Sequence, residues 1–198
     1  MKKLALFCFN TRKKITNRLA TFLARLHLKW WGVLVGSNLF VRGFLVLIPK
    51  GKLIIGNNVT INSAPVSVGG SIRRTAFRVE PEGTLVIKDG VGMSNITVIC
   101  FDSITFEEGA MIGGGCEFLD GDAHPLAPAS RAMKGNRGKT GPIVIGKNTF
   151  IGGKSTVLKG VTVGEGAVIG MGSLVTKNIP PYEIWAGVPA RFIKKLEM

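Results

Sequence analysis

Residues 145–180 read IGKNTF IGGKST VLKGVT VGEGAV IGMGSL VTKNIP, six consecutive units of six residues without a break in phase. A period of six fits neither the 3.6-residue turn of an α-helix nor the alternation of a single strand. It fits a parallel β-coil in which each unit is a short strand and a turn, three units complete one triangular coil, and the opening residues stack inward. The openers are Ile145, Ile151, Val157, Val163, Ile169 and Val175, and the small or β-branched fifth positions are Thr149, Ser155, Val161, Ala167, Ser173 and Ile179.

Earlier parts of the chain show the same six-residue spacing in shorter groups, each with its own phase. Loops or irregular coils must therefore separate these groups. The 27 glycines also favour a fold that is dense in tight turns. The groups are Ile55 and Ile61, then Ile87, Met93 and Ile99, and then Phe106, Ile112 and Phe118.

These units resemble the hexapeptide repeat of bacterial acyltransferases, and the resemblance covers roughly residues 50–193. It implies an all-β fold, namely a left-handed parallel β-helix that assembles as a homotrimer. We therefore expect a helical extension over residues 1–36 and the β-helix over residues 37–179, with an active-site loop at residues 119–142. Residues 180–198 would form a closing segment.

The formal net charge of +14 belongs to the N-terminal part of the chain, because Glu80 is the first acidic residue. This excess predicts either an anionic partner or a solvated basic face. Residues 11–31 predict an amphipathic helix, which either lies on a membrane surface or packs against the β-helix or a neighbouring subunit. Its apolar stripe comprises Ile15, Leu19, Phe22, Leu23, Leu26 and Trp30, and the basic margin comprises Lys14, Arg18, Arg25 and Lys29.

The cysteines and the apolar segments bear on location. Cys8, Cys100 and Cys116 are odd in number and lack disulfide or zinc spacing, which favours a reducing compartment. The apolar run at residues 4–9, which follows Lys2 and Lys3, is too short for a signal peptide. The apolar stretch at residues 33–48 is interrupted by Arg42 and is too short to span a bilayer. We expect a cytoplasmic protein, with peripheral contact at the inner membrane face as the alternative that the basic N-terminus suggests.

Histidine is the side chain that most simply takes a proton from a hydroxyl near neutral pH, and the chain contains only His27 and His124. His27 falls within the predicted basic helix, which leaves His124 as the candidate general base. Residues two apart in an extended stretch share a face, so Asp122 and Asp120 could orient the imidazole. The alternative is that both carboxylates satisfy backbone groups of a turn.

The run DAHP at residues 122–125, followed by Arg131, resembles the active-site loop of hexapeptide O-acetyltransferases that modify sugars, in which this histidine is the base. The resemblance implies acetyl-CoA as the acyl donor. A thioester is already activated, so a bound hydroxyl can attack it directly without a covalent acyl-enzyme. Gly153 stands where the family places the amide that stabilises the oxyanion, although a glycine in a repeat turn has the same pattern.

Residues 180–191, PPYEIWAGVPAR, resemble the closing signature of the same family. In those enzymes coenzyme A lies in a groove between adjacent subunits, with its phosphates near basic side chains. Carried over by position, the resemblance assigns coenzyme A contacts to Gly153, Met171, Thr176, Lys177, Arg191 and Lys194.

The acceptor site is less specified, with Asn95 and Arg131 as candidates. The chain resembles family members of this length in which a basic extension replaces the helical cap of the maltose and galactoside acetyltransferases. This resemblance favours a saccharide of a surface polysaccharide, including a lipid-linked one, over a small free sugar. An N-acetyltransferase acting on an amino sugar and a non-catalytic β-helix scaffold remain alternatives. The γ-class carbonic anhydrases share the coil but need three zinc-binding histidines, and this chain has two, so no metal is expected. No nucleic-acid partner is expected either, because the chain contains no recognised nucleic-acid-binding module.

Overall fold

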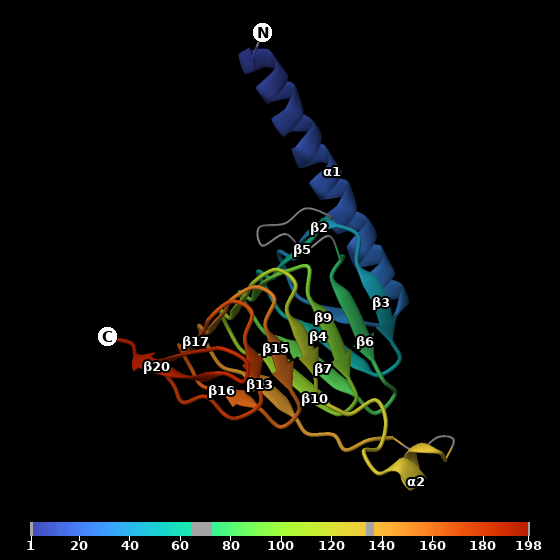
Figure 1. The fold of residues 1–198 in the computed structure, drawn as a ribbon. Helices are drawn as coiled ribbons and strands as arrows, with labels where there is room; N and C mark the ends of the chain where they lie inside the picture. The colour runs from blue at the N-terminus through green and yellow to red at the C-terminus, as the bar shows by residue number, and fades with distance from the viewer. Residues whose placement is uncertain (1, 65–72, 134–136, 198) are drawn as a thin grey trace.

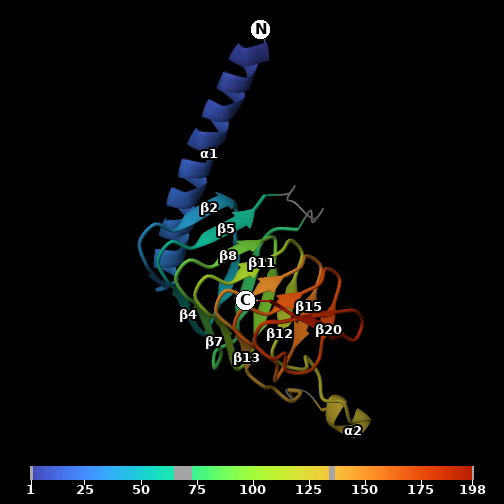
Figure 2. The ribbon, with the colours of Figure 1, turned by 90° about the vertical axis from the view of Figure 1, so that its left-hand side faces the viewer.

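The computed structural model describes residues 2–64, 73–133 and 137–197, with side chains from Thr16 onward. A long helix, α1 (Lys2–Trp30), precedes a column of short strands, as Figure 1 shows. After α1 the chain visits three sheets in a constant order, so that three successive strands form one coil and the next coil stacks on it. Figure 1 shows this stacking from the side, and Figure 2 shows the same coils from the C-terminal end of the column.

The strands of all three sheets run parallel to their neighbours, apart from the last hairpin. The first sheet contains β1 (Leu34–Val35), β4 (Lys52–Ile55), β7 (Thr84–Ile87), β10 (Ser103–Phe106), β13 (Ile143–Ile145) and β16 (Thr162–Val163). The second contains β2 (Phe40–Gly43), β5 (Thr60–Ser63), β8 (Gly92–Ser94), β11 (Met111–Ile112), β14 (Phe150–Ile151), β17 (Val168–Ile169), β19 (Glu183–Ala186) and β20 (Arg191–Lys195). The third contains β3 (Val46–Pro49), β6 (Ala76–Val79), β9 (Thr97–Cys100), β12 (Glu117–Leu119), β15 (Thr156–Leu158) and β18 (Leu174–Val175).

The core is a column of aliphatic and aromatic side chains inside the coils. Every opener and every fifth-position residue of the 145–180 repeat is buried. The openers also align between coils, since Ile87 pairs with Phe106 and Phe106 pairs with Ile145 in neighbouring strands. Burial and register together confirm the inward-facing column that the six-residue period predicts.

One predicted opener was wrong. Val98 is fully buried and pairs with Phe118, whereas Ile99 is only half-buried. The chain turns at Asn95, whose φ is +49°, and Val98 follows Met93 one residue earlier than the regular period requires. A shift of one residue along a strand exchanges the inward and outward side chains, so Val98 takes the core position.

Helix α1 packs on the first coil through a face of mostly small residues, to which Leu28 adds one bulky side chain. Ala20, Ala24 and Leu28 are buried at this contact. Thr21 adds two hydrogen bonds to β2, because its hydroxyl donates to the Val41 carbonyl and accepts from the Val41 amide, each at 3.0 Å. Small side chains allow the helix backbone to approach the strand closely. The helix also begins well before residue 11, where the sequence placed its start.

The predicted apolar stripe lies on a different face of α1 and remains exposed. Its described members, which we call the apolar stripe from here on, are Leu19, Phe22, Leu23, Leu26 and Trp30. The alternative in which these residues pack against their own coil is therefore not what the structure shows. Ile15 and Lys14 lie outside the described side chains. Within the described part of the chain, neither helix has the combination of length and apolarity that a membrane crossing requires.

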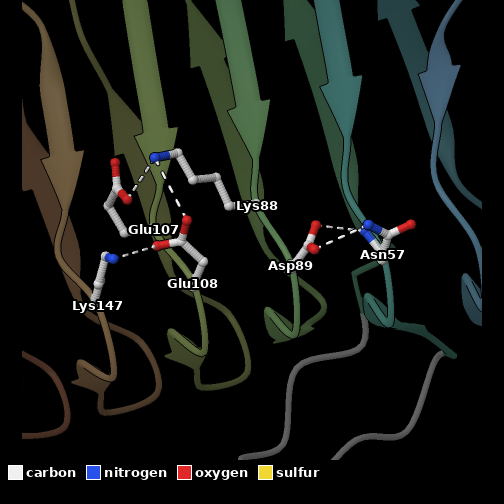
Figure 3. Close-up of polar contacts among 6 residues, drawn as sticks. All are labelled: Asn57, Lys88, Asp89, Glu107, Glu108 and Lys147. Carbon is white, nitrogen blue, oxygen red and sulfur yellow. Dashed lines mark hydrogen bonds and ion pairs between the residues drawn. The ribbon is translucent and has the colours of Figure 1, made fainter.

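Polar side chains connect successive coils at the turns that follow the first sheet (Figure 3). The Asp89 carboxylate accepts hydrogen bonds from the amide and the side-chain nitrogen of Asn57, at 2.7 and 2.9 Å. These hydrogen bonds from Asn57 lower the pKa of the Asp89 carboxyl. One coil further on, the Lys88 ammonium lies 2.8 Å from the Glu107 carboxylate, and the Lys147 ammonium lies 3.3 Å from the Glu108 carboxylate. Each contact is exposed and weak alone, but the series ties neighbouring coils in one register.

A C-terminal hairpin closes the column. Strand β19 pairs with β17 in parallel, and β20 then pairs with β19 in the antiparallel direction. Trp185 of β19 packs against the core, and its ring meets Phe192 edge-on with centroids 6.3 Å apart. The hairpin therefore covers the end of the last coil. It also ends the second sheet with an antiparallel strand, whereas the preceding strands are parallel.

Candidate functional site

The segment between β12 and β13 leaves the coil, carries the short helix α2 (Pro128–Arg131) and returns, projecting from one corner in Figure 1. Its two ends are tied together at the base. The amide of Asp122 donates to the Lys139 carbonyl at 3.0 Å, and the amide of Gly141 donates to the Asp120 carbonyl at 2.8 Å. A bridge between Gly121 and Thr140 completes this closure. The loop predicted around His124 therefore starts from a fixed base.

Asp120 lies beneath this loop as a backbone-binding group. Its side chain is fully buried, and its two carboxylate oxygens accept hydrogen bonds from the amides of Phe101 and Asp102, at 2.6 and 2.9 Å. These amides belong to the neighbouring coil. Asp120 thus anchors the start of the loop, which is the backbone-satisfying alternative that the sequence left open.

Asp122 contacts a lysine that sequence reasoning missed. Its carboxylate forms a close ion pair with the ammonium of Lys159, which follows β15 on the next coil. Among the described residues, no hydrogen bond joins the His124 ring to Asp122 or Asp120. The role of Asp122 as the group that orients His124 therefore stays a prediction. The repeat pattern offered no signal for Lys159, because only stacking of two coils brings it to the loop.

His124 is exposed at the edge of a cavity of about 610 Å³. The cavity is bounded by the loop on one side and by β15 and the end of β18 on the other. Arg131 and Lys159 bring two cationic groups to the same space, and Thr176 lies on its far wall. The structure thus brings the candidate base, Arg131 and Thr176 to one cavity, and their roles stay predictions. The arrangement can hold a polar or anionic molecule beside a free imidazole.

A second cavity, of about 510 Å³, lies over the second sheet and contains Gly153 and Met171. Its floor is largely apolar, with Met93, Ile112 and Phe150 among its lining residues. In the described part of the chain, no group accepts a hydrogen bond from the Gly153 amide, so this N–H is available to a ligand. The predicted site residues therefore divide between two cavities on different sides of the coil.

The remaining predicted contacts are not among the lining residues of either cavity. Lys177 is exposed directly after Thr176 of the His124 cavity, and Arg191 and Lys194 are exposed on β20 of the closing hairpin. Asn95 is buried, and its side-chain nitrogen donates to the carbonyls of Ala64 and Arg73. Asn95 therefore holds the chain beside it in place through its side-chain nitrogen, and its contact with an acceptor stays a prediction.

The described cysteines are poorly suited to act as nucleophiles. Burial raises the pKa of the Cys116 thiol to about 11, and its sulfur lies 3.3 Å from the Gly152 carbonyl. Burial also raises the pKa of Cys100, with a further contribution from the neighbouring Asp120 carboxylate. Both thiols stay protonated near neutral pH, and only a thiolate attacks efficiently.

Comparison with known proteins identifies the repeat. Residues 142–177 match the family model of the hexapeptide repeat of succinyl-transferase. The C-terminal coils therefore contain a hexapeptide repeat. The resemblance seen in the six-residue units is thereby confirmed for this segment, which includes the openers from Ile145 to Val175 and Gly153 and Met171 of the second cavity.

Several curated relatives of this chain are named as acetyltransferases. A putative acetyltransferase of Staphylococcus aureus is 54% identical over 59 residues, which are 30% of this chain and 30% of that protein. Galactoside O-acetyltransferase of Escherichia coli is 36% identical over 102 residues, covering 52% of this chain and 49% of that protein. A probable acetyltransferase of Mycobacterium tuberculosis is 27% identical, covering 91% of this chain and 66% of that protein. The chain thus matches only about a third to a half of the length of the first two relatives.

Solved structures share the fold of this chain. A variant of the N-acyltransferase AntD from Bacillus cereus, in complex with dTDP-4-amino-4,6-dideoxyglucose and coenzyme A, has a TM-score of 0.71 at 22% identity, covering 88% of this chain and 90% of that chain. Galactoside acetyltransferase in complex with coenzyme A has a TM-score of 0.61 at 26% identity, covering 87% of this chain and 70% of that chain.

Proposed function

We propose that this protein transfers an acetyl group from acetyl-CoA to a hydroxyl of a saccharide, with His124 as the general base. In this proposal the β-coil is left-handed and three copies associate around a three-fold axis in the cytoplasm. The acceptor is a saccharide of a surface polysaccharide under construction. The observation that carries the proposal is the exposed imidazole of His124 at the edge of a cavity of about 610 Å³ that also contains two cationic side chains.

The proposed reaction needs one group that moves a proton and one that stabilises negative charge. His124 takes the proton of the acceptor hydroxyl, and the hydroxyl oxygen attacks the carbonyl carbon of the thioester. The resulting tetrahedral oxyanion accepts a hydrogen bond from the Gly153 amide, which no described group occupies. Collapse breaks the carbon–sulfur bond, and the departing thiolate receives the proton from His124. The buried, protonated cysteines take no part.

The separation of His124 from Gly153 supports an assembled site. The two residues line different cavities of one chain, so a single copy does not place both against one thioester. Packing around a three-fold axis brings one side of a coil against a different side of its neighbour, because such contacts are heterologous. Coenzyme A would then lie between the His124 cavity of one subunit and the Gly153 cavity of the next.

A second candidate is N-acylation of an amino sugar. The AntD structure that shares this fold is described as an N-acyltransferase and contains an amino-sugar nucleotide together with coenzyme A. The same base and oxyanion amide serve an amine nucleophile equally well. An acceptor whose amine replaces the hydroxyl at one position separates the two reactions.

The test is release of the coenzyme A thiol from acetyl-CoA with a panel of mono- and lipid-linked saccharides and their amino-sugar counterparts. We expect His124→Ala to lower turnover by about two to four orders of magnitude, the range for loss of a general base, while coenzyme A binding is kept. His27→Ala is the matched control, since His27 is also exposed but lies on α1 and accepts a hydrogen bond from Trp31.

Near-normal turnover of His124→Ala would remove His124 from the mechanism. Failure of the wild-type protein to bind coenzyme A at all would favour the scaffold alternative. Release of thiol only with amino sugars would replace O-acetylation by N-acetylation.

A further inference from the structure

The outer face of α1 is apolar and largely exposed. All members of the apolar stripe are at least two-fifths exposed, from 41% at Leu23 to 76% at Trp30. Helix α1 contacts the first coil through its opposite face, where Ala20, Ala24 and Leu28 are buried. The stripe therefore does not belong to the interface between α1 and the coil. An exposed apolar surface of this kind on one helix face marks an interaction site.

The stripe continues onto the first coil. Leu19 and Leu23 form one wall of a groove, and Phe44, in the turn after β2, forms the other. The groove contains two hollows of about 320 and 230 Å³. Phe44 itself is 56% exposed. The apolar surface therefore spans α1, the groove and the adjoining turn, all at the same end of the coil.

Cations border this surface on both sides. Arg18, Arg25 and Lys29 lie on exposed positions of α1 beside the stripe, and Arg25 is held in place by a 2.7 Å hydrogen bond to the Gly36 carbonyl. Across the groove, Arg42 lines the larger hollow. Arg74 stacks over the Phe44 ring at 5.6 Å.

No acidic residue precedes Glu80 in the sequence, so nothing in α1 or the first coil offsets these charges. Two copies meeting through this surface would bring like charges together, which disfavours a second copy as its occupant. A nucleic acid would satisfy the cations but leave the apolar stripe in water. An anionic bilayer satisfies both, because the stripe enters the interface while the cations meet the head groups.

We infer that α1 and the first coil bind the surface of an anionic lipid bilayer, with the apolar stripe and Phe44 inserted at the head-group boundary and Arg18, Lys29, Arg42 and Arg74 around them. In Figure 2, α1 and the segment that carries α2 lie on opposite sides of the coil, so this surface lies away from the His124 loop. The binding is peripheral and does not depend on the proposed reaction.

The experiment is sedimentation of the full chain with phosphatidylcholine vesicles that contain or lack phosphatidylglycerol, in low and high salt. We expect sedimentation with the anionic vesicles only, and weaker binding in high salt. The double change Phe22→Gln and Leu26→Gln should lower vesicle affinity at least tenfold, and Lys29→Gln about fivefold. Phe192→Gln, which changes a phenylalanine on β20 that is about half exposed, should bind as the wild type does.

Each variant is checked for an unchanged melting temperature, and no coenzyme A or acceptor is added, so the outcome is separate from that of the acyl-transfer assay. Unchanged vesicle binding by the double variant would overturn the inference, as would equal binding to neutral and anionic vesicles. A smaller particle for the double variant in sedimentation velocity without lipid would instead show that the stripe covers a second copy.

Discussion

Asp120 illustrates how a residue's neighbours decide its role. Its spacing from His124 suggested an orienting carboxylate, and the same spacing suits a group that satisfies a turn. In the structure both oxygens accept hydrogen bonds from backbone amides of the adjacent coil, and the side chain is buried. A local sequence pattern does not separate these roles, because the partner amides lie about twenty residues earlier in the chain.

We expect Asp120→Asn to lower the free energy of unfolding by about 1–3 kcal/mol, because the amide NH₂ would face a backbone N–H and leave it without an acceptor. Chemical denaturation measures this loss. Turnover per folded molecule should stay within a few-fold of wild type. Glu117→Gln makes the same carboxyl-to-amide change at a partly exposed side chain and should have little effect on stability. A large loss of turnover without a loss of stability would show that Asp120 contributes to the reaction, for example by orienting His124.

The turns between strands impose their own requirement, which is close approach of successive coils. A side-chain carbon added at Gly146 would lie 2.6 Å from the Val163 carbonyl oxygen and 2.8 Å from the Glu165 nitrogen, both backbone atoms of the next coil. The glycines after the openers were visible in the sequence. Their reason was not, since it comes from the next coil along the column, some eighteen residues ahead.

Gly146→Ala should therefore destabilise the protein by about 1–3 kcal/mol, as overpacking against an immovable backbone does. Gly92→Ala is the matched control, because an added carbon there meets nothing within 4 Å and the backbone is not in the left-handed region. Thermal unfolding of the two variants under identical conditions checks the difference. Equal melting temperatures would show that the coils can separate locally at little cost.

The proposed trimer makes the reaction a property of the assembly. His124 and Met171 occupy different cavities of one chain, about 610 and 510 Å³ in volume. In a cyclic trimer each complete site would combine His124 of one copy with Met171 of its neighbour. Neither variant of these residues disturbs the core, because both side chains are exposed.

Co-expression of His124→Ala chains with Met171→Glu chains, followed by purification through a different tag on each, tests this arrangement. Every mixed cyclic trimer then contains one complete site, so thiol release should recover to about one third of wild type. Each variant alone should be nearly inactive, and two differently tagged His124→Ala chains should stay so. Mixed particles as inactive as the single variants would place the whole site within one chain.

The sequence by itself determined the coil, because a six-residue period with aliphatic openers buries a continuous column only when short parallel strands stack. It also singled out His124 and the loop that carries it, since one histidine remained outside the basic helix. The tertiary structure alone decided which face of α1 packs, brought Lys159 to Asp122 and assigned Asp120 to backbone amides. These contacts join residues on different coils or elements, and local spacing carries no information about which neighbours meet once the coils stack.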